Sequence, residues 1–485
     1  MSTLSSSVNH YDDYEIVIGI EVHVQLNTQS KIFCACPNGP AQTPNTNICP
    51  ICTGQPGVLP VLNAQVVQSA IMAGLATNCH INTLSYFARK HYFYPDLPKN
   101  FQTTQSDLPI CIDGHVSIPL EDGSIKNIRL IRIHIEEDAG KNIHSSYSNE
   151  SFVDLNRTGT PLLEIVTHPD IRSIYEAQAY LKTLHAIVVH LGICSGNMEE
   201  GAFRADTNIS VRKKGDPKLG TRCELKNINS FKFIGDAIKY EVKRQIDLLE
   251  DGKKITQETR LWDTKERKTL AMRSKEEAAD YRYFNEPDLP PLLIDAQWIE
   301  SVKKQLPELP AQKLERLTQK GLTPYEAEIL INDTELAQYY EQAAQNTQSK
   351  ALINWILRDL IGLLKEKNIS LTSTKITPQK LAALVELIET GALNNRAAQE
   401  ILALIEQTGQ EPQAIMHERG LQQIGSSDEI EAIIKEIIIT NPTQVTAYKA
   451  GTTKLWGFFV GQAMAKTKGK GNPQMINDLL KKYLE

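Results

Sequence analysis

The sequence predicts an α+β protein: a strand-rich N-terminal part with an antiparallel or mixed sheet, then an all-α part and a small helical tail. Before residue 296, short runs of alternating apolar and polar residues are separated by Gly, Pro and Asn. After Pro290–Ile294, apolar residues recur at helical spacing almost to the end. At 485 residues the chain is too long for one core. We therefore expect a disordered lead-in (1–13) and three domains, at 14–296, 297–408 and 409–485.

The composition is that of a globular protein, with 41% hydrophobic and 23% charged residues. No apolar run approaches the roughly 18 residues that a membrane span needs, and the first ten residues lack the features of a signal or transit peptide. We expect a cytoplasmic protein without a membrane segment. The net charge of -6 argues against a dedicated nucleic-acid coat, although a local basic patch can still bind RNA.

Tyr14–Leu26 alternates as a strand does. One face is wholly apolar and belongs on a core: Ile16, Ile18, Ile20, Val22, Val24 and Leu26. Glu21 and His23 lie next to each other on the opposite face. A carboxylate beside an imidazole can hold a divalent metal or perform acid–base chemistry; the alternative is a polar strand face in water.

Four clustered cysteines form a CxC…CxxC pattern: Cys34, Cys36, Cys49 and Cys52. Each close pair can span one edge of a tetrahedron, and the chain shows no secretion signal, so the spacing favours a closed, structural zinc site over disulfides. The alternative is two reduced surface thiol pairs.

A second strand, Ile128–Ile135, is expected to bury Ile131, Ile133 and Ile135 and to place Arg132, His134 and Glu136 opposite. It ends in the acidic run Glu136, Glu137 and Asp138, which suits Mg²⁺ or, alternatively, a solvated turn. Glu164 lies in the apolar run Pro161–Val166, where an unpaired carboxylate is costly, so it should have a cationic or hydrogen-bonding partner.

Several polar segments have donors that suit a phosphate or ribose: the turn 154–160, the strands 201–211 and 220–231, and the cationic and aromatic stretches 271–275 and 280–283. Each alone could be a solvated face or turn. The residues of these segments that we expect to contact a phosphate, a nucleotide or another substrate are Asn156, Arg157, Arg204, Asp206, Asn208, Lys226, Asn227, Ser230 and Arg273.

Helical periodicity predicts the remaining elements. In the first domain helices are expected at 174–191 and 231–249, and in the second at 325–346, 349–366, 377–389 and 397–406. Thr377 and Pro378 form a helix start, with threonine as the N-cap. The last domain should contain helices at 429–438, 455–466 and 473–483.

Lysines dominate the charge of the tail, and residues 466–472 form a basic, glycine-containing loop. Such a loop either solubilises the surface or contacts an RNA backbone without reading sequence. The lysines expected to contact RNA are Lys449, Lys454, Lys466, Lys468 and Lys470.

Two common catalytic motifs are missing from the sequence. No GxxxxGK[ST] phosphate loop occurs, so an ATP site would be of another kind, and no GxSxG nucleophile motif occurs.

These motifs together resemble the GatB family, which supplies one of the three subunits of the aspartyl/glutamyl-tRNA amidotransferase, the GatCAB complex. The resemblance covers essentially the whole chain. It rests on the segments 18–26, 55–63, 89–99, 135–141, 154–161, 201–208 and 280–284. Residues 290–294 run straight into helices without an inserted domain, which favours the three-subunit type over the archaeal type.

The resemblance implies a cradle domain, a helical domain and a YqeY-like tail that binds tRNA. It implies ATP-dependent activation of the side-chain carboxylate of Glu-tRNA(Gln) or Asp-tRNA(Asn), then amidation with ammonia from the glutaminase partner, GatA; GatC completes the heterotrimer. The residues that it places at a Mg²⁺ site and in catalysis are Glu21, His23, Glu136 or Glu137, and Glu164. Some relatives lack the cysteines, so zinc would serve the scaffold. The competing hypothesis is an RNA-binding or assembly protein without its own chemistry.

Overall fold

The computed structural model describes residues 10–144, 149–272, 280–423, 427–467 and 471–484. Contacts between residues divide the chain into two compact units, Met1–Pro310 and Ala311–Glu485. The α+β prediction is confirmed, because a sheet-rich region is followed by helices. The expected domain boundaries stay predictions. Of the expected lead-in, His10–Asp13 form a 3-10 turn, and residues 1–9 lie outside the described part.

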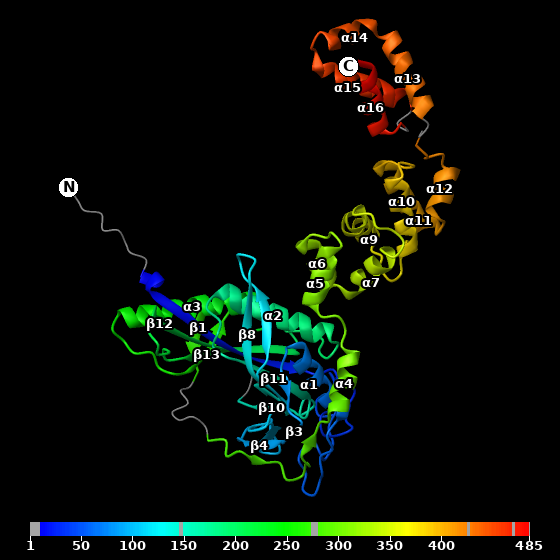
Figure 1. The fold of residues 1–485 in the computed structure, drawn as a ribbon. Helices are drawn as coiled ribbons and strands as arrows, with labels where there is room; N and C mark the ends of the chain where they lie inside the picture. Colours follow the sequence, from blue (N-terminus) through cyan, green and yellow to red (C-terminus); the bar gives the residue numbers. More distant parts are fainter. Residues whose placement is uncertain (1–9, 145–148, 273–279, 424–426, 468–470, 485) are drawn as a thin grey trace, which may run out of the picture. The chain divides into compact units, whose positions relative to one another are not determined.

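The first unit is built on a ten-stranded mixed sheet (Figure 1). Its strands lie in the order β15 (Lys268–Ala271), β14 (Thr259–Asp263), β13 (Cys223–Lys226), β12 (Phe203–Lys213), β1 (Tyr14–Gln25), β11 (Pro161–Thr167), β8 (Ile125–Glu137), β6 (Cys111–Ile112) and β2 (His80–Ile81), and β7 (His115–Pro119) pairs with β8. All neighbouring pairs are antiparallel except β13 and β14.

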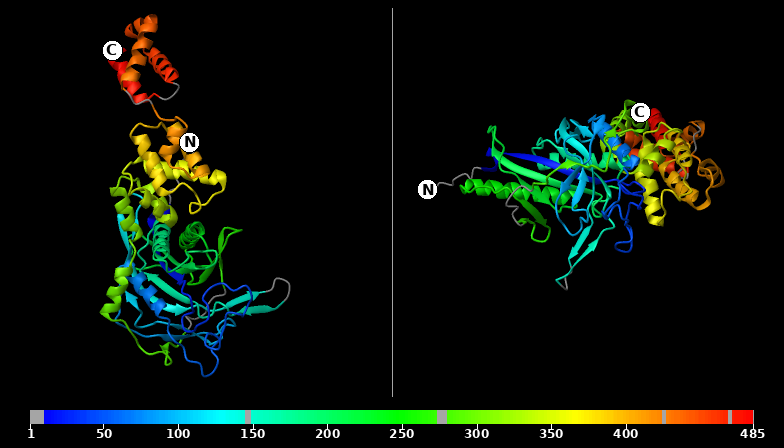
Figure 2. Two further views of the ribbon diagram at one scale, coloured as in Figure 1. Left: turned by 90° about the vertical axis from the view of Figure 1, so that its right-hand side faces the viewer. Right: turned by 90° about the horizontal axis from the view of Figure 1, so that it is seen from below.

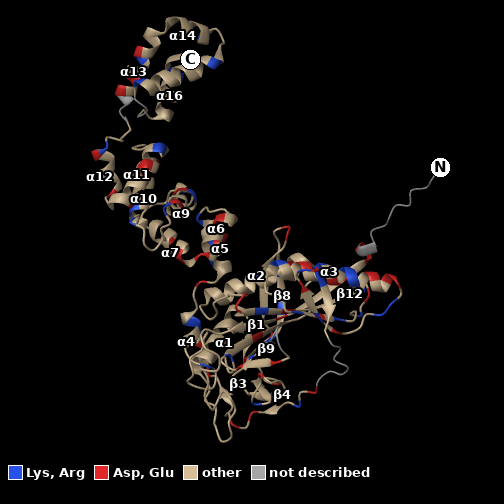
Figure 3. Ribbon diagram, turned by 180° about the vertical axis from the view of Figure 1, so that it is seen from behind, with Lys and Arg blue, Asp and Glu red and all other residues tan. Residues whose placement is uncertain are grey.

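Apolar side chains of the sheet pack against helices α1 (Ala64–Ala76), α2 (Ile174–His190) and α3 (Phe231–Glu250). The predicted apolar face of β1 is confirmed: Ile18, Ile20, Val22 and Val24 are at most 1% exposed, and Ile16 is half-buried. Helix α4 (Ala296–Gln305) contributes Val302 to the same core. Acidic and basic residues are interspersed along α3 (Figure 3). Because this core takes one face of β1, Glu21 and His23 lie on the other.

Three small sheets complete the first unit. They are β16 (Phe284–Asn285) with β4 (Ala88–His91) and β5 (Phe101–Thr104); β17 (Leu292–Leu293) with β3 (Leu84–Ser85); and the hairpin β9 (Lys141–His144) with β10 (Ser151–Asp154), which projects from the main sheet (Figure 2). Strand β5 packs against β8. That contact matters for the site, because it brings polar groups of β5 to the end of β8.

One expectation about β8 is wrong. Ile131 is 36% exposed, whereas Ile133 and Ile135 are fully buried. The register between β11 and β8 shifts between Val166 and Thr167, which pair with Arg132 and Leu130. A bulge therefore leaves Ile131 outside the ladder and reverses the alternation before it. After the bulge, the expected polar face of Arg132, His134 and Glu136 is retained.

The second unit is helical and has two separate cores, one formed within residues 317–421 and one within residues 430–484. Its first helices are α5 (Pro310–Gln319, which begins at the unit boundary), α6 (Pro324–Asn332), α7 (Thr334–Ala343), α8 (Ala351–Asn354), the π-helical turn η2 (Trp355–Leu360), α9 (Ile361–Lys367), α10 (Pro378–Glu389), α11 (Asn395–Thr408) and α12 (Pro412–Glu418). The predicted start of α10 is confirmed, with the Thr377 side chain accepting from Lys380 N–H.

The helix expected over 325–346 is instead two helices. Asp333 is extended rather than helical, and its side chain accepts a hydrogen bond from Leu336 N–H. It therefore caps α7 and breaks the run, which apolar periodicity alone does not reveal.

The tail contains α13 (Ser427–Thr440), α14 (Pro442–Lys449), the turn η3 (Thr453–Leu455), α15 (Trp456–Lys466) and α16 (Pro473–Leu484). The three predicted tail helices are thus confirmed, and α14 is additional. Within the described residues, no helix combines the length and apolarity that a membrane crossing requires.

Candidate functional site

A row of polar side chains crosses four neighbouring strands on the face opposite the helices. His23 on β1 pairs directly with Arg204 on β12 and with Glu164 on β11, and Glu164 pairs with His134 on β8. Side chains opposite each other on one face lie within contact distance. Strand pairing therefore fixes these four groups without any contribution from loops.

The carboxylates and imidazoles of this row and its neighbours form a carboxylate–imidazole centre, made of Glu21, His23, His134, Glu136 and Glu164. His23 Nε2 lies 3.6 Å from Glu21 Oε1, 3.6 Å from Glu136 Oε1 and 3.4 Å from Glu164 Oε2. His134 Nε2 lies 3.3 Å from Glu164 Oε2 and 3.6 Å from Glu136 Oε2. Glu136 and Glu164 are only 2% and 6% exposed, so their charges need partners.

The histidines supply those partners as protonated groups. Burial lowers the pKa of His23, but its hydrogen bond to Glu164 and the charges of the surrounding carboxylates outweigh this and raise it to about 9. The pKa of His134 is also raised to about 9, because Glu164 and Glu136 overcome its burial. Burial would raise the pKa of Glu164, but His134 and His23 hold it well below the usual range. Burial, together with the charge of Glu164, raises the pKa of Glu21.

The donor set fits a divalent cation. Ligand atoms of His23, Glu136 and Glu164 lie within 4.8 Å of one another, and so do those of Glu21, His23 and Asp206. Carboxylate oxygens suit hard cations such as Mg²⁺, which commonly meet one or two carboxylates directly. The positive charge that two imidazolium groups now place among the carboxylates is the charge that a cation would supply.

Adjacent strand positions send Glu136 and Glu137 to different places. Glu137 forms an ion pair with Lys99 and accepts a 2.8 Å hydrogen bond from Thr103 N–H on β5. Glu136 joins the centre and lies near Thr104, whose Oγ1 is 3.4 Å from Glu136 Oε2. The structure thus brings together four of the five expected catalytic and metal residues, and it places Glu137 apart from them.

The expected ATP or substrate residues of β12 and β13 flank the centre. Lys226 Nζ lies 2.8 Å from Asp206 Oδ2 and 3.1 Å from Glu224 Oε1. Arg204 donates to Asp138 Oδ2 at 3.0 Å and remains 36% exposed. Asn208 lies on the same face of β12 as Arg204 and Asp206, because side chains two residues apart on a strand share a face. Arg204, paired with His23, and Lys226, whose charge acts on Glu21, thus place two cations beside the carboxylate–imidazole centre.

Several other expected ATP or substrate residues also make contacts within the chain. Asn156 donates to Thr43 C=O and accepts from Asn47 N–H, at 2.8 Å each, and so holds the loop between the cysteine pairs. Arg157 donates to the carbonyls of Ala139 and Gly140. Ser230 caps α3, and Asn227 has a left-handed backbone with φ 62°. Arg273 lies outside the described residues.

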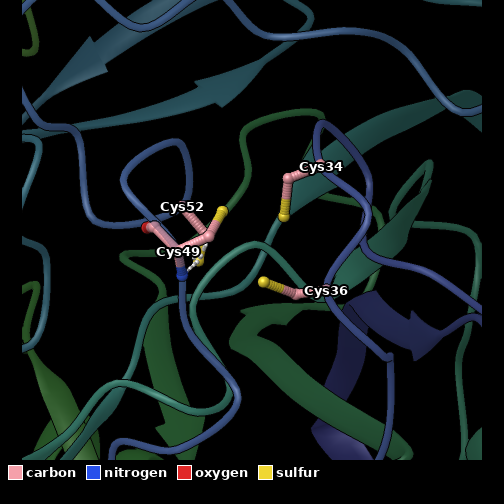
Figure 4. A group of neighbouring side chains, drawn as sticks. All are labelled: Cys34, Cys36, Cys49 and Cys52. Atoms are coloured by element: carbon pink, nitrogen blue, oxygen red, sulfur yellow. Dashed lines mark hydrogen bonds between the residues drawn. The ribbon is translucent and has the colours of Figure 1, made fainter.

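The four clustered cysteines converge from two turns (Figure 4), with all sulfurs within 4.8 Å of one another. Cys49 Sγ and Cys52 Sγ are 3.9 Å apart; a tetrahedron with Zn–S bonds of about 2.3 Å has edges of about 3.8 Å. Hydrogen bonding from Cys34 lowers the pKa of Cys52 to about 5, despite burial. Lys31, 1% exposed, lies 3.8 Å from Cys52 Sγ and adds a compensating positive charge. The cluster fits a structural zinc ion.

The expected tail lysines are only partly described. Lys449 ends α14, Lys454 lies in η3, and Lys466 Nζ contacts Glu436 Oε1. Lys468 and Lys470 lie outside the described residues.

Sequence reasoning missed two parts of the site. His134 was expected on the polar face but not as a member of the centre, although its position two residues before Glu136 is the signal that could have placed it there. Lys99 and its ion pair with Glu137 had no local signal, because the two residues meet only when β5 packs on β8.

Comparison with known proteins gives a consistent picture. Residues 16–300 match a family model described as GatB/GatE catalytic domain, and residues 338–484 match one described as GatB domain. Proteins named as the B subunit of aspartyl/glutamyl-tRNA(Asn/Gln) amidotransferase align over nearly the full length. The protein of Geotalea daltonii is 52% identical, covering 98% of this chain and 100% of the relative. Those of Thermodesulfovibrio yellowstonii and Myxococcus xanthus are each 50% identical, covering 97% of this chain and 99% of the relative.

Proposed function

The chain belongs to the GatB family of aspartyl/glutamyl-tRNA(Asn/Gln) amidotransferase B subunits, and from that premise we propose that its carboxylate–imidazole centre activates the tRNA-linked substrate. The enzyme is a tRNA-dependent ligase that forms a carbon–nitrogen bond with glutamine as the amido donor. The proposed substrate is the side-chain carboxylate of Glu-tRNA(Gln), Asp-tRNA(Asn) or both. This carboxylate attacks the γ-phosphate of ATP, releasing ADP and giving an acyl phosphate. Ammonia then displaces the phosphate and leaves an amide.

The observation that carries this proposal is the convergence of His23, Glu136 and Glu164 from three adjacent strands. A rigid sheet holds such a constellation more precisely than loops do. Phosphoryl transfer depends mainly on positioning and charge neutralisation. Mg²⁺ held by Glu21, His23, Glu136 and Glu164 would supply that neutralisation.

The flanking cations have complementary roles. Arg204 is partly exposed and fixed at one edge by Asp138, so its remaining donors can orient phosphate oxygens. Lys226 is held between Asp206 and Glu224 and offers a second positive charge. A guanidinium and an ammonium placed in this way would align ATP with the substrate carboxylate.

The remaining parts follow from the family. Ammonia would come from glutamine hydrolysed by the glutaminase partner, GatA, with GatC completing the complex; the lack of a GxSxG motif in this chain is compatible with that division of labour. Zn²⁺ at the four cysteines would stabilise this loop of the cradle domain. Lys449, Lys454 and Lys466, with the basic loop that follows, would contact the tRNA backbone.

The test uses the reconstituted three-subunit enzyme with Glu136→Gln, and with Glu121→Gln in an exposed turn as the matched control. We expect Glu136→Gln to lower tRNA-dependent ATP cleavage by about 100-fold or more, while glutamine hydrolysis remains measurable. The control should behave as the parent enzyme. Undiminished ATP cleavage by Glu136→Gln would overturn the assignment, and with it the idea that this chain performs the activation.

A further inference from the structure

A cavity of about 200 Å³ lies between residues 34–57, here called the cysteine loop, and the end of β8. Cys34, Cys52 and Gly54 form one side, and Lys99, Thr103 and Glu137 lie on the other. The cavity therefore lies between two features that are far apart in the sequence: the four-cysteine cluster and the Lys99–Glu137 ion pair.

Gly54, two residues after Cys52, is pressed against Lys99. A Cβ at position 54 would lie 2.5 Å from Lys99 Cγ and 3.2 Å from Lys99 Cα. The first distance is shorter than real Cβ contacts, and the second, to a backbone atom, is tighter than most of them, so Lys99 would have to shift. Gly57, in the same loop, also has positive φ (87° against 68°), but a Cβ there would meet nothing within 4 Å. The close approach is therefore specific to Gly54.

Lys99 in turn connects to the centre through Glu137. Its ammonium pairs with Glu137, lies 3.3 Å from Thr103 Oγ1 and is over the Phe101 ring at 4.9 Å. Glu137 also accepts from Thr103 N–H, and its carbonyl accepts from Gln102 Nε2, so β5 and β8 are fastened at this point. The preceding residue, Glu136, directs its carboxylate into the centre.

We propose that the cysteine loop is a positioning device: Gly54, held by the metal-bound cysteines, sets Lys99 against Glu137 and thereby fixes the end of β8 that carries Glu136. The cluster then supports the chemistry without touching substrate. When the four sulfurs bind zinc, the turn 49–54 is held at both cysteines and its backbone is a rigid wall for Lys99. Without the metal, the backbone of this turn becomes more mobile and the Lys99–Glu137 ion pair becomes exposed to solvent.

Chemical labelling of Lys99 tests the positioning directly. The full chain is treated with an amine-acylating reagent, and mass spectrometry gives the rate at Lys99 relative to Lys253, whose side chain is 63% exposed. The parent should label slowly at Lys99, which is 11% exposed and ion-paired. Gly54→Ala should raise that rate at least about tenfold, the factor expected for loss of one charged hydrogen bond; Gly57→Ala should not. No change in Gly54→Ala, or an equal change in both variants, would overturn the proposal.

Removing zinc from the parent chain under reducing conditions gives a second arm that needs no substitution. Chelation, verified by metal analysis, should raise Lys99 labelling in the same way. Unchanged labelling after verified loss of zinc would overturn the role of the cluster, even if Gly54→Ala failed to fold.

The kinetic consequence rests on the proposed function. In the three-subunit enzyme, Gly54→Ala should raise the Mg²⁺ concentration that gives half-maximal ATP cleavage, whereas Gly57→Ala should leave it unchanged. An unshifted Mg²⁺ dependence in Gly54→Ala would overturn the link to Glu136. The labelling result does not depend on ATP or Mg²⁺, so a failure of the proposed function is distinguishable from a failure of the positioning.

Discussion

His23 and Glu164 face each other directly across β1 and β11, with His23 Nε2 3.4 Å from Glu164 Oε2. Glu164 makes a second imidazole contact, at 3.3 Å, with His134 on its other neighbouring strand. One buried carboxylate thus lies between two imidazoles, and each histidine is held in its charged form. The charge balance of the site follows from this arrangement, and so does its response to pH, metal and substitution.

The pH dependence of stability has a definite sign. His23 and His134 each have a pKa of about 9 in the folded chain, above the ordinary value of 6.5. A pKa raised by folding gives stability that is fully present below 6.5 and is lost as pH rises through 9. Without added divalent cation, we expect the melting temperature of the first unit to fall across this interval. Glu164→Gln should flatten the fall; a melting temperature that rises from pH 6.5 to 9 would contradict the protonation states.

The affinity for Mg²⁺ should rise over the pH range in which stability without the cation falls. A bound cation replaces the positive charge of the imidazolium groups, so its binding displaces protons from the histidines and becomes tighter as pH rises from 6.5 to 9. Calorimetry in buffers of different ionisation enthalpy measures the protons released. Mg²⁺ binding without proton release near pH 7.5 would show that the His23 imidazole does not coordinate the cation.

Substitution of Asn156 distinguishes a role in supporting the cysteine loop from a role in binding the nucleotide. Its side chain bonds the backbone of Thr43 and Asn47 in the cysteine loop. Asn156→Ala should therefore speed zinc loss to a chelator by roughly tenfold, as for loss of a supporting contact around a metal, and leave the KM for ATP unchanged. Arg204→Ala, beside the centre, should show the opposite pattern. A raised KM for ATP with normal zinc retention in Asn156→Ala would show that Asn156 contacts the nucleotide.

Glu241 anchors α3 to the far end of the sheet. It is fully buried, accepts a bidentate pair of hydrogen bonds from Arg244, and lies 3.3 Å from Arg260. Glu241→Ala leaves two partly buried guanidinium groups without this partner, so we expect a loss of about 3–5 kcal/mol in unfolding free energy. Urea unfolding checks this against Asp251→Ala at the exposed end of α3, which should change by less than about 0.5 kcal/mol. Equal effects would contradict the burial of the network.

Sequence alone predicts much of this site because strand alternation is a local rule. The period of β1 places Glu21 and His23 opposite the core, and the structure agrees. The spacing of the four cysteines likewise predicts their convergence. Neither inference needs to know which strands are neighbours.

What the sequence does not predict depends on packing between distant segments. Ile131 is exposed because a bulge forms where β8 pairs with β11. The partners of Glu137 come from the packing of β5 on β8, which brings Thr103 N–H and Lys99 to its carboxylate. The hydrogen bonds of Asn156 to the backbone of Thr43 and Asn47 likewise join segments that the sequence does not place together. In each case the decisive partner is far away along the chain.

The central claim is that the carboxylate–imidazole centre binds a divalent cation, and Mn²⁺ binding followed by electron paramagnetic resonance tests it most directly. The full chain should bind Mn²⁺ in competition with Mg²⁺, and Glu121→Gln should bind as the parent does. Glu164→Gln should weaken binding by at least about 100-fold, beyond the effect of removing an outer contact. Mn²⁺ affinity unchanged in Glu164→Gln would contradict the account.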